Sequence, residues 1–243
     1  MPEHQGLAIV QSGYFQSDDF YDVDGSSVAQ PAFRKWEIQP YVEYGATDWL
    51  TVGGSTFLQR VSQSGQSNEG LADTELFARS ALWHSTDGHE HISLQPLVKL
   101  PSFFTSGGTP RGGSRSTDLE LSLLYGSNLE ILSDRDFADL RVGYRTRSRG
   151  LNSQWRMDAA LGVQLSEHIQ LIPAARVILA TQYDDSANFS ENAEQDFDLL
   201  KLELTAAYHL DKEHWLQLTA FDHVAGAQVG AGRGLMLGIA ERF

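Results

Sequence analysis

The sequence predicts an all-β fold, a single-domain transmembrane antiparallel β-barrel of about twelve strands that spans residues 1–243. Three observations predict this class. Segments of alternating apolar and polar residues recur along the chain, and most approach the roughly 9–11 residues that a tilted strand needs to cross a bilayer. The connections between them are alternately short and mostly long, and the number of segments is even. Since successive side chains of a strand point to opposite faces, such segments can close into a ring that is apolar outside and polar inside.

The clearest alternating segment covers residues 34–45. Its apolar and polar side chains separate by parity, with Trp36, Ile38, Val42 and Tyr44 opposite Lys35, Glu37, Gln39, Tyr41 and Glu43. Along the chain we expect strands at residues 7–16, 34–45, 50–59, 72–83, 92–100, 118–126, 138–149, 154–165, 169–183, 198–210, 215–224 and 235–243. Only in the first of these does the pattern leave open which face meets lipid, because both parities carry apolar groups.

The connections form two classes. Short ones are expected at residues 46–48, 84–90, 127–136, 166–168 and 211–214, and mostly longer ones at 17–33, 62–70, 102–116, 184–195 and 225–233, with 150–153 as a short exception. Outer-membrane barrels have short periplasmic turns and longer extracellular loops, so we expect both termini on the periplasmic side. A soluble β-sandwich also has many short strands, but it does not require this separation of apolar and charged residues in nearly every strand.

Composition excludes several classes of protein. The chain has no Cys, which excludes disulfide frameworks and zinc–thiolate sites, and its formal net charge is -14. Such acidity argues against nucleic acid as a partner, because nucleic-acid binding needs a basic surface. No segment approaches the roughly 20 apolar residues of a membrane helix. The polar start at Met1–Gln5 does not resemble a secretory signal, and we interpret the sequence as a mature one without its signal peptide.

The last strand indicates the cellular location. Apolar residues alternate from Leu235 onward, and the chain ends on Phe243. This ending resembles the assembly signal of bacterial outer-membrane barrels, although Glu241 stands where that signal usually has another aromatic residue. The resemblance implies a place in the bacterial outer membrane, in contact with lipid and lipopolysaccharide, and recognition of this strand by the barrel-assembly machinery.

An arginine-rich set is the most distinctive feature of the expected lumen. Four arginines share one parity on a single segment, and two more follow on the next two segments: Arg141, Arg145, Arg147 and Arg149, then Arg156 and Arg176. Guanidinium groups remain charged and bind carboxylates or phosphates in a bidentate manner. An arginine wall in a pore is therefore the chemistry expected of an anion-conducting channel.

Carboxylates of the same parity provide the alternative interpretation. Acidic and basic side chains are expected inside the barrel together, so the arginines either guide a solute or pair with carboxylates and fill a lumen only modestly wider than a packed one. Besides the arginines, the pore-lining and solute-guiding candidates are Lys99, Glu37, Glu43, Glu75, Glu120 and Tyr41. Aromatic rings are expected inside as well, at Phe57, Phe77, Trp83, Trp215 and Phe221.

Catalytic and metal-binding patterns are weak. Most of the histidines lie near short connections, and only His223 lies toward the opposite end of a strand, without a nucleophile within reach. The cluster His84–His91 has the residue types of a metal site, but its Thr86-Asp87-Gly88 centre is typical of a hairpin turn. The segment Asp22–Ser26 lacks the later bidentate Glu of a calcium loop. We predict no enzyme, no metal site and no other cofactor. The acidic loops are interpreted as solvated, and loose binding of divalent cations to them is left open.

The hairpin Tyr41–Gly54 contains Tyr44-Gly45-Ala46-Thr47-Asp48 followed by an alternating strand. It is similar to a hairpin of the outer-membrane channel family named after the meta-pathway of phenol degradation, whose members also end on an aromatic residue. The resemblance implies a twelve-stranded channel for passive uptake of small aromatic or amphipathic molecules, and it carries over no binding residue. The arginines of the lumen add small anionic organic molecules to the expected solutes. The alternatives are an outer-membrane lipid or lipopolysaccharide hydrolase, a closed structural barrel and an acidic-oligosaccharide porin. The sequence leaves open the solute, the oligomeric state and whether the loop Pro101–Ser116 folds inward.

Overall fold

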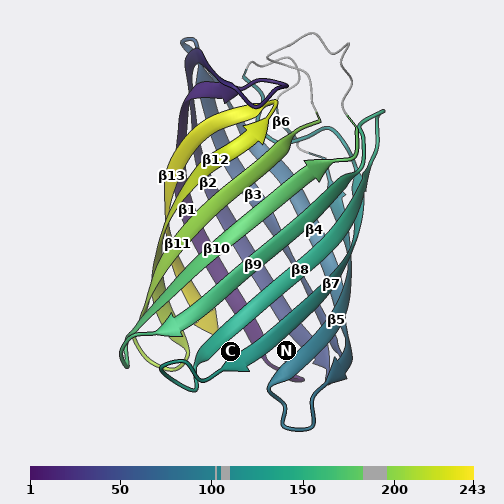
Figure 1. Cartoon of the computed structure of the whole chain (residues 1–243), viewed down its shortest axis with the longest axis vertical. Helices are drawn as coiled ribbons and strands as arrows, with labels where there is room; N and C mark the ends of the chain where they lie inside the picture. The colour runs from purple at the N-terminus through teal and green to yellow at the C-terminus, as the bar shows by residue number, and fades with distance from the viewer. Residues whose placement is uncertain (102, 105–109, 183–195) are drawn as a thin grey trace.

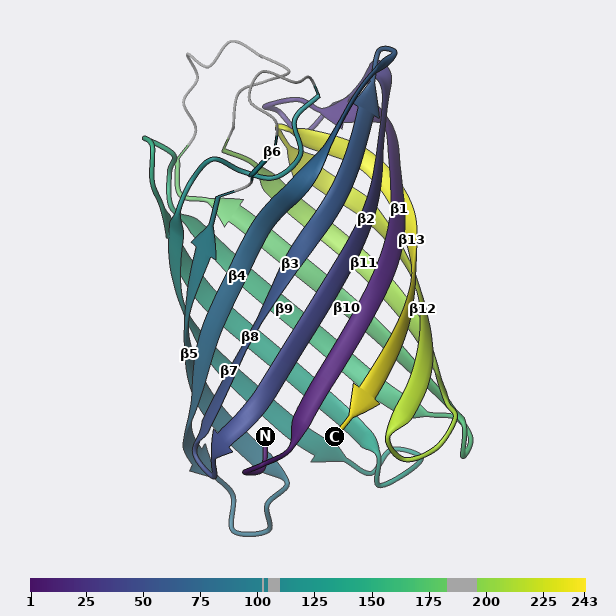
Figure 2. The same ribbon diagram turned by 180° about the vertical axis from the view of Figure 1, so that it is seen from behind.

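The computed structural model describes residues 1–101, 103–104, 110–182 and 196–243. Over these residues one antiparallel sheet contains thirteen strands, and all but the two-residue β6 form a closed ring. Strand β1 pairs with β13, which closes the ring between the two ends of the chain. Figures 1 and 2 show the resulting barrel, with the N- and C-termini at the same end. No helix in the described part of the chain is long and apolar enough to cross a membrane.

The strands are bounded as follows: β1 Gly6–Tyr21, β2 Ser27–Thr47, β3 Leu50–Gln63, β4 Gln66–His84, β5 Glu90–Leu100, β6 Phe103–Phe104, β7 Asp118–Leu129, β8 Asp136–Arg147, β9 Gln154–Gln164, β10 Ile169–Ala180, β11 Asp198–His209, β12 His214–Ala227 and β13 Val229–Arg242. Each of the twelve expected strands corresponds to one strand of the ring. The short β6 pairs only with β4.

Three of the connections expected as long loops are instead extended hairpins. The strands continue to tight turns after Tyr21, at Ser64–Gly65 and at Gln228, and the turns contain residues with positive φ, such as Gly25 (77°) and Gly65 (76°). In these extensions Ser, Gly and Gln replace the apolar alternation, and the sequence pattern therefore resembles a loop. The backbone ladder continues regardless of side-chain polarity, because its hydrogen bonds join main-chain groups.

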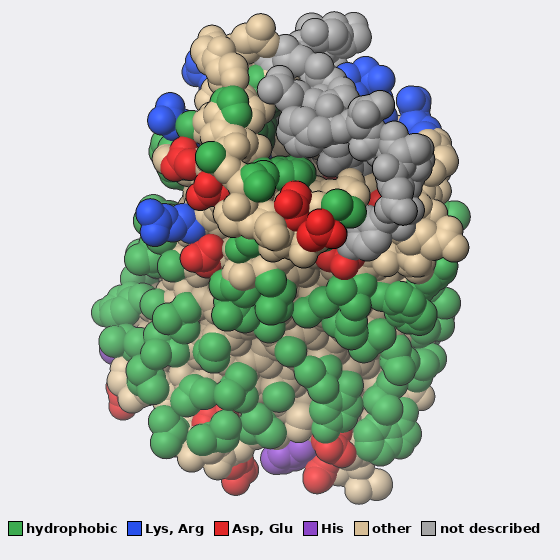
Figure 3. Space-filling model, turned by 45° about the horizontal axis from the view of Figure 1, so that its top comes forward, with side chains coloured by type: hydrophobic (Ala, Val, Ile, Leu, Met, Phe, Trp, Pro, Cys, Tyr) green, Lys and Arg blue, Asp and Glu red, His purple; other side chains and the backbone are tan. Residues whose placement is uncertain are grey.

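The outer face is apolar and the inner face is polar. On β7, Leu119, Leu121 and Leu123 are each more than half exposed outside, whereas Asp118, Glu120 and Ser122 are buried inside. Hydrophobic side chains cover a broad band of the visible wall, and charged side chains lie above this band and at the lower rim in the view of Figure 3. The face that β1 presents outward is now also defined, since Val10 and Tyr14 pair with the outward Pro40 and Trp36.

One aromatic residue lies on the face opposite to the predicted one. Trp83 was expected inside, but the register of β4 against β5 shifts between Ala81 and Trp83. Beyond this bulge Trp83 stands opposite Ile92, on the outward face, and it is half exposed. A bulge inserts one unpaired residue and thereby reverses the parity of everything after it. Strict alternation cannot reveal such an insertion.

Three prolines of the outward face interrupt the ladder locally. Pairing of β2 with β3 stops at Ile38 and resumes at Tyr41, on either side of Pro40. Similar gaps occur beside Pro96, between β4 and β5, and beside Pro173, between β9 and β10. Proline has no N–H to donate, so one neighbouring ladder is lost. Each proline keeps its pairing position on the other side, and the wall remains continuous there.

Glycines of β13 create space for aromatic rings on the inner wall. A side chain at Gly234 would meet Cζ of Phe221 at 2.4 Å and the Tyr14 carbonyl oxygen at 2.4 Å, and one at Gly232 would meet Cζ of Phe15 at 2.6 Å. The rings of Phe15 and Phe221 stack over this strand, with centroids 6.0 Å apart. The inward glycines are therefore a packing requirement of the neighbouring strands.

We predict that Gly234→Val destabilises the barrel by about 1–3 kcal/mol, the usual cost of overpacking. The physical reason is that a backbone carbonyl, which cannot rotate away, lies where the new Cβ must go. The measurement is the urea midpoint of unfolding in detergent micelles, followed by tryptophan fluorescence. Ala231→Val is the control, since it introduces the same side chain on the outward face of the same strand. Equal midpoints for the two variants would contradict the packing argument.

Candidate functional site

Strand register brings distant charges into one row inside the barrel. Arg141 on β8 stands opposite Asp158 on β9, Asp158 stands opposite Arg176 on β10, and Arg176 stands opposite Lys201 on β11. Directly opposed residues of antiparallel strands project to the same face with Cβ atoms about 4.5–5.5 Å apart. The inner wall from β8 to β11 therefore carries three cations and one carboxylate side by side.

Glu120 is the centre of an ion-pair network next to this row. Its carboxylate, which is fully buried, accepts hydrogen bonds from Nη2 of Arg141 and from Nε of Arg145 at 2.6 Å. Nε of Arg156 lies 3.6 Å from the same group, and the Ser122 hydroxyl donates to it at 2.7 Å. One carboxylate is thus shared by three guanidinium groups, and two of these also lie near a second carboxylate, Arg141 near Asp158 and Arg145 near Glu75.

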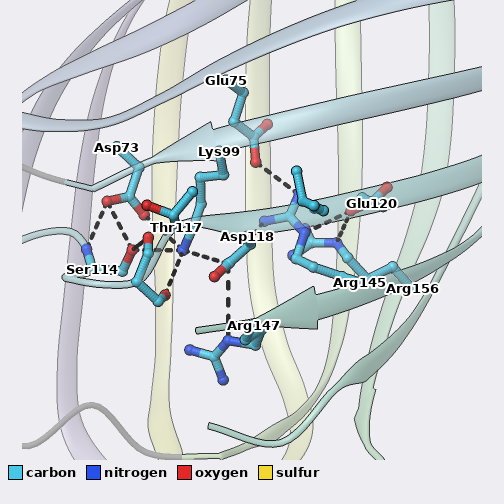
Figure 4. Close-up of polar contacts among 12 residues, drawn as sticks. Asp73, Glu75, Lys99, Ser114, Thr117, Asp118, Glu120, Arg145, Arg147 and Arg156 are labelled. Atoms are coloured by element: carbon cyan, nitrogen blue, oxygen red, sulfur yellow. Dashed lines mark hydrogen bonds and ion pairs between the residues drawn. The ribbon is translucent and has the colours of Figure 1, made fainter. Parts of the chain in front are cut away.

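The network continues along the inner wall from Glu120 to Glu75, Asp118 and Lys99 (Figure 4). Arg145 also donates to Glu75 of β4 at 2.8 Å, and Arg147 donates to Asp196 at 3.2 Å. Asp118, which the sequence analysis did not single out, lies between them and pairs with Lys99 at 2.7 Å. Its position two residues before Glu120 on the same face is the signal that identifies it. The predicted residues Lys99, Glu75, Glu120, Arg145 and Arg147 are therefore parts of one network.

Part of the loop Pro101–Ser116 is fixed to the inner wall. The Ser114 N–H and hydroxyl donate to Asp73 at 2.7 and 3.1 Å, and Lys99 donates to the Ser114 hydroxyl at 2.6 Å. Ser116 is fully buried. Residues 110–117 thus fold inward over β4, β5 and β7, whereas residue 102 and residues 105–109 lie outside the described part.

A separate polar cluster occupies the facing wall, on β2 to β5. Tyr41 donates to Glu43 at 2.9 Å, and Arg79 pairs with the same carboxylate at 3.1 Å. Lys35 pairs with Glu37 at 2.8 Å. The predicted pore-lining residues Tyr41, Glu37 and Glu43 thus project inward as a group that is held by internal hydrogen bonds and ion pairs.

The arginine ladder is shorter than expected. Strand β8 ends at Arg147, and Arg149 lies exposed in the following turn with a φ of 63°. The same turn accounts for the short connection between β8 and β9. The ladder consists of Arg141, Arg145 and Arg147, because the extended conformation that would carry Arg149 along the inner wall ends before it.

The inward arginines differ in their access to water. The side chains of Arg145 and Arg147 are 4% and 6% exposed, whereas that of Arg176 is 48% exposed. Arg141 and Arg176 line a cavity of about 280 Å³, together with Arg79, Asp139 and Asp158. A solute in the lumen can therefore reach the row Arg141–Asp158–Arg176, but not the buried part of the network.

The other motifs form turns. In the segment His84–His91, Asp87 accepts hydrogen bonds from the Ser85 hydroxyl and the His89 N–H, which hold the pKa of this carboxyl below its usual range. Asp22 likewise accepts from the N–H groups of Asp24 and Ser26. Among the described residues, no group of three or more His, Asp or Glu is arranged to bind a metal ion. The acidic residues of the loop 184–195 lie outside the described residues, and Asp196, which follows them, is described.

The architecture defines a class: a closed antiparallel barrel of twelve strands. An outer-membrane channel from Pseudomonas putida F1 is similar to it, with a TM-score of 0.79 and 15% sequence identity over 100% of this chain and 97% of that chain. The NanC porin has a TM-score of 0.62 and 10% identity, covering 96% of this chain and 98% of its own. A KdgM porin in complex with disordered oligogalacturonate has a TM-score of 0.55 and 10% identity, covering 97% and 99%. No family model and no curated protein sequence matches the chain.

These likenesses confirm the predicted fold. The chain has the fold of outer-membrane β-barrel channels, with no helix in the described part and with its first and last strands paired. At identities of 15% or less, the likeness concerns the arrangement of strands and not the residues of the lumen.

Glu120 provides the first prediction on the site. Glu120→Gln removes the charge that three guanidinium groups share, and the loss of one member of a buried ion pair costs about 3 kcal/mol. We expect the urea midpoint of unfolding to fall accordingly. Glu69→Gln, at an exposed position of β4, is the control and should leave the midpoint unchanged. A Glu120→Gln variant as stable as the wild type would show that the arginines do not depend on this carboxylate.

Asp73 provides a prediction on the loop. Asp73→Ala removes two hydrogen bonds to Ser114, each worth roughly 1 kcal/mol, so residues 110–117 should leave the wall more often. We expect trypsin to cleave after the exposed Arg115 about thirtyfold faster when opening and closing are fast relative to cleavage, because roughly 2 kcal/mol changes the open population by that factor. Asp48→Ala, in a turn at the other end of the barrel, should not change this rate. Unchanged cleavage in Asp73→Ala would mean that other contacts hold the segment.

Proposed function

We propose that the protein is a bacterial outer-membrane channel for the passive diffusion of small anionic or amphipathic organic molecules, aromatic ones included. The observation that carries the proposal is the combination of an apolar outer wall with guanidinium groups that face water inside a closed barrel. An inward ring of Arg or Lys favours anions in a pore. The fold of channel proteins supports the same conclusion.

The orientation in the membrane belongs to this proposal. Both termini lie at one end, and the long hairpin extensions of β1–β2, β3–β4 and β12–β13 lie at the other (Figure 1). We place the terminal end in the periplasm, because outer-membrane barrels keep their short turns there. Phe243 closes the ring against Gly6 through two backbone hydrogen bonds, at 2.6 and 3.0 Å. We assign this last strand as the segment that the barrel-assembly machinery recognises, with lipid and lipopolysaccharide as the surroundings of the outer wall.

Several observations weigh on the alternatives. His223 lies on β12, toward the end of the barrel opposite the termini. Its Nδ1 contacts the Gly230 carbonyl oxygen at 2.9 Å, and its ring lies against Phe15. This is a packed position and not that of a general base, which weighs against the hydrolase. An acidic-oligosaccharide porin remains a second candidate, because the row of Arg141, Arg176 and Lys201 would suit a polyanion. The inward segment 110–117 and the cavity of about 280 Å³ favour a smaller solute.

Electrical recording in a planar bilayer tests the channel. We predict a steady conductance with a reversal potential that indicates anion preference in a salt gradient. Arg176→Gln should lower that preference without abolishing conductance. Arg176 is half exposed, and the substitution removes one positive charge from the lumen.

Arg60→Gln is the matched control for this measurement. Arg60 is an exposed residue of β3 opposite Trp36, on the outward face, so its removal changes the net charge equally without changing the lumen. A wild type without conductance would contradict the channel and favour the closed structural barrel. Equal selectivity in the wild type and Arg176→Gln would restrict Arg176 to a structural role.

A further inference from the structure

Asp158 lies between two arginines without being hydrogen-bonded to either. Its carboxylate is 3.7 Å from Nη1 of Arg141 and 3.8 Å from Nη1 of Arg176. The other carboxylates that contact these arginines are bound more closely, since Arg176 donates through Nε to Glu203 at 2.8 Å and Arg141 donates through Nη2 to Glu120. Beyond about 3.5 Å a hydrogen bond is no longer formed. Of the carboxylates that contact Arg141 and Arg176, Asp158 is therefore held more weakly than Glu120 and Glu203.

Both arginines are fixed on one side and open on the other. Nε and Nη2 of Arg141 donate to Ser122 and Glu120, while Nε of Arg176 donates to Glu203. Within the described residues, Nη1 of Arg141 and both terminal nitrogens of Arg176 form no hydrogen bond. Two anchored guanidinium groups with free N–H donors toward the same point are suited to bind a carboxylate.

The space for a ligand is adjacent. The cavity of about 280 Å³ is lined by Arg141, Asp158 and Arg176, and its wall carries the small residues Gly126, Ala160 and Ala174. Ligand pockets for drug-sized molecules begin at about 300 Å³, so this cavity has room for a small organic acid. Its polar and apolar lining together match a molecule with one carboxylate and a compact apolar part.

We propose that Asp158 is a built-in counter-ion, which occupies the anion subsite between Arg141 and Arg176 until a permeating organic carboxylate displaces it. This inference rests on the proposed function and names the step that sets affinity within the lumen. While Asp158 stays between the arginines, a solute carboxylate is bound weakly and is released again. Weak binding is what conduction requires, because a solute must leave its site as readily as it enters.

The test measures binding of benzoate to the purified, detergent-solubilised protein by isothermal titration calorimetry. Asp158→Asn keeps the size of the side chain and removes its charge, and we expect benzoate to bind at least about tenfold more tightly than to the wild type, because a like charge next to the ligand is removed. Arg176→Gln should weaken binding in either background. In bilayers, benzoate should then block the chloride current of Asp158→Asn at lower concentration than that of the wild type.

Asp139→Asn is the matched control, because Asp139 lines the same cavity but forms no ion pair among the described residues. We expect less than about a threefold change in affinity there, as for a general change of potential. Equal gains in Asp139→Asn and Asp158→Asn would overturn the displacement model, and so would weaker binding in Asp158→Asn. Should Asp158→Asn not fold, Asp158→Ala carries the same expectation. Binding in micelles needs no conduction, so a failure here is distinct from failure of the channel, which chloride conductance alone decides.

Discussion

The pairing of β1 with β13 is the constraint on which the remaining structure depends. Their register runs from Leu7 opposite Arg242 to Tyr21 opposite Val229, and it leaves the ring of strands without an edge. In a lipid environment each unpaired main-chain group costs several kcal/mol, so closure is a condition for any such wall. Closure also fixes which parity of every strand faces inward. The charged lumen is thus a consequence of register, because a slip by one residue would place Arg141 and Glu120 outside.

Inside the ring, the charges serve two purposes that the contacts separate. Arg145 and Arg147 are buried and are held by Glu120, Glu75 and Asp196, so they connect β8 to β4, β7 and the segment before β11. Arg176 has one firm partner and is half exposed. A buried, fully paired guanidinium contributes little to the potential that a solute meets, whereas an exposed one contributes directly. The sequence left structural pairing and solute guiding open as alternatives. The contacts support a structural role for Arg145 and Arg147, and solute guiding by Arg176 is what we propose.

Alternation along the chain predicts much of this structure, and its failures have specific causes. Period two identifies the strands and the inward positions of Lys99, Glu75 and Glu120, because side-chain direction depends only on parity. The bulge before Trp83 and the turn at Arg149 break that parity, and neither leaves a mark in the apolar pattern. The difference between Arg145 and Arg176 could not be predicted, since burial depends on partners from distant strands. The position of Asp158 between two arginines follows from the register of three strands, which the pattern of a single strand does not contain.

The row Arg141–Asp158–Arg176 shows how a narrow barrel can favour an anion without retaining it. Two cations alone at this distance would repel each other and would bind an organic carboxylate too firmly for rapid release. A carboxylate at hydrogen-bond distance from both would use their remaining N–H donors and leave no site for a solute. Asp158 lies 3.7 and 3.8 Å from the two guanidinium groups, so the arginines are neither without a counter-ion nor hydrogen-bonded to this one. It reduces the repulsion while the firm bonds of the arginines go to Glu120 and Glu203. In the proposal made above, the affinity of the lumen is set by competition between this fixed carboxylate and the carboxylate of the solute.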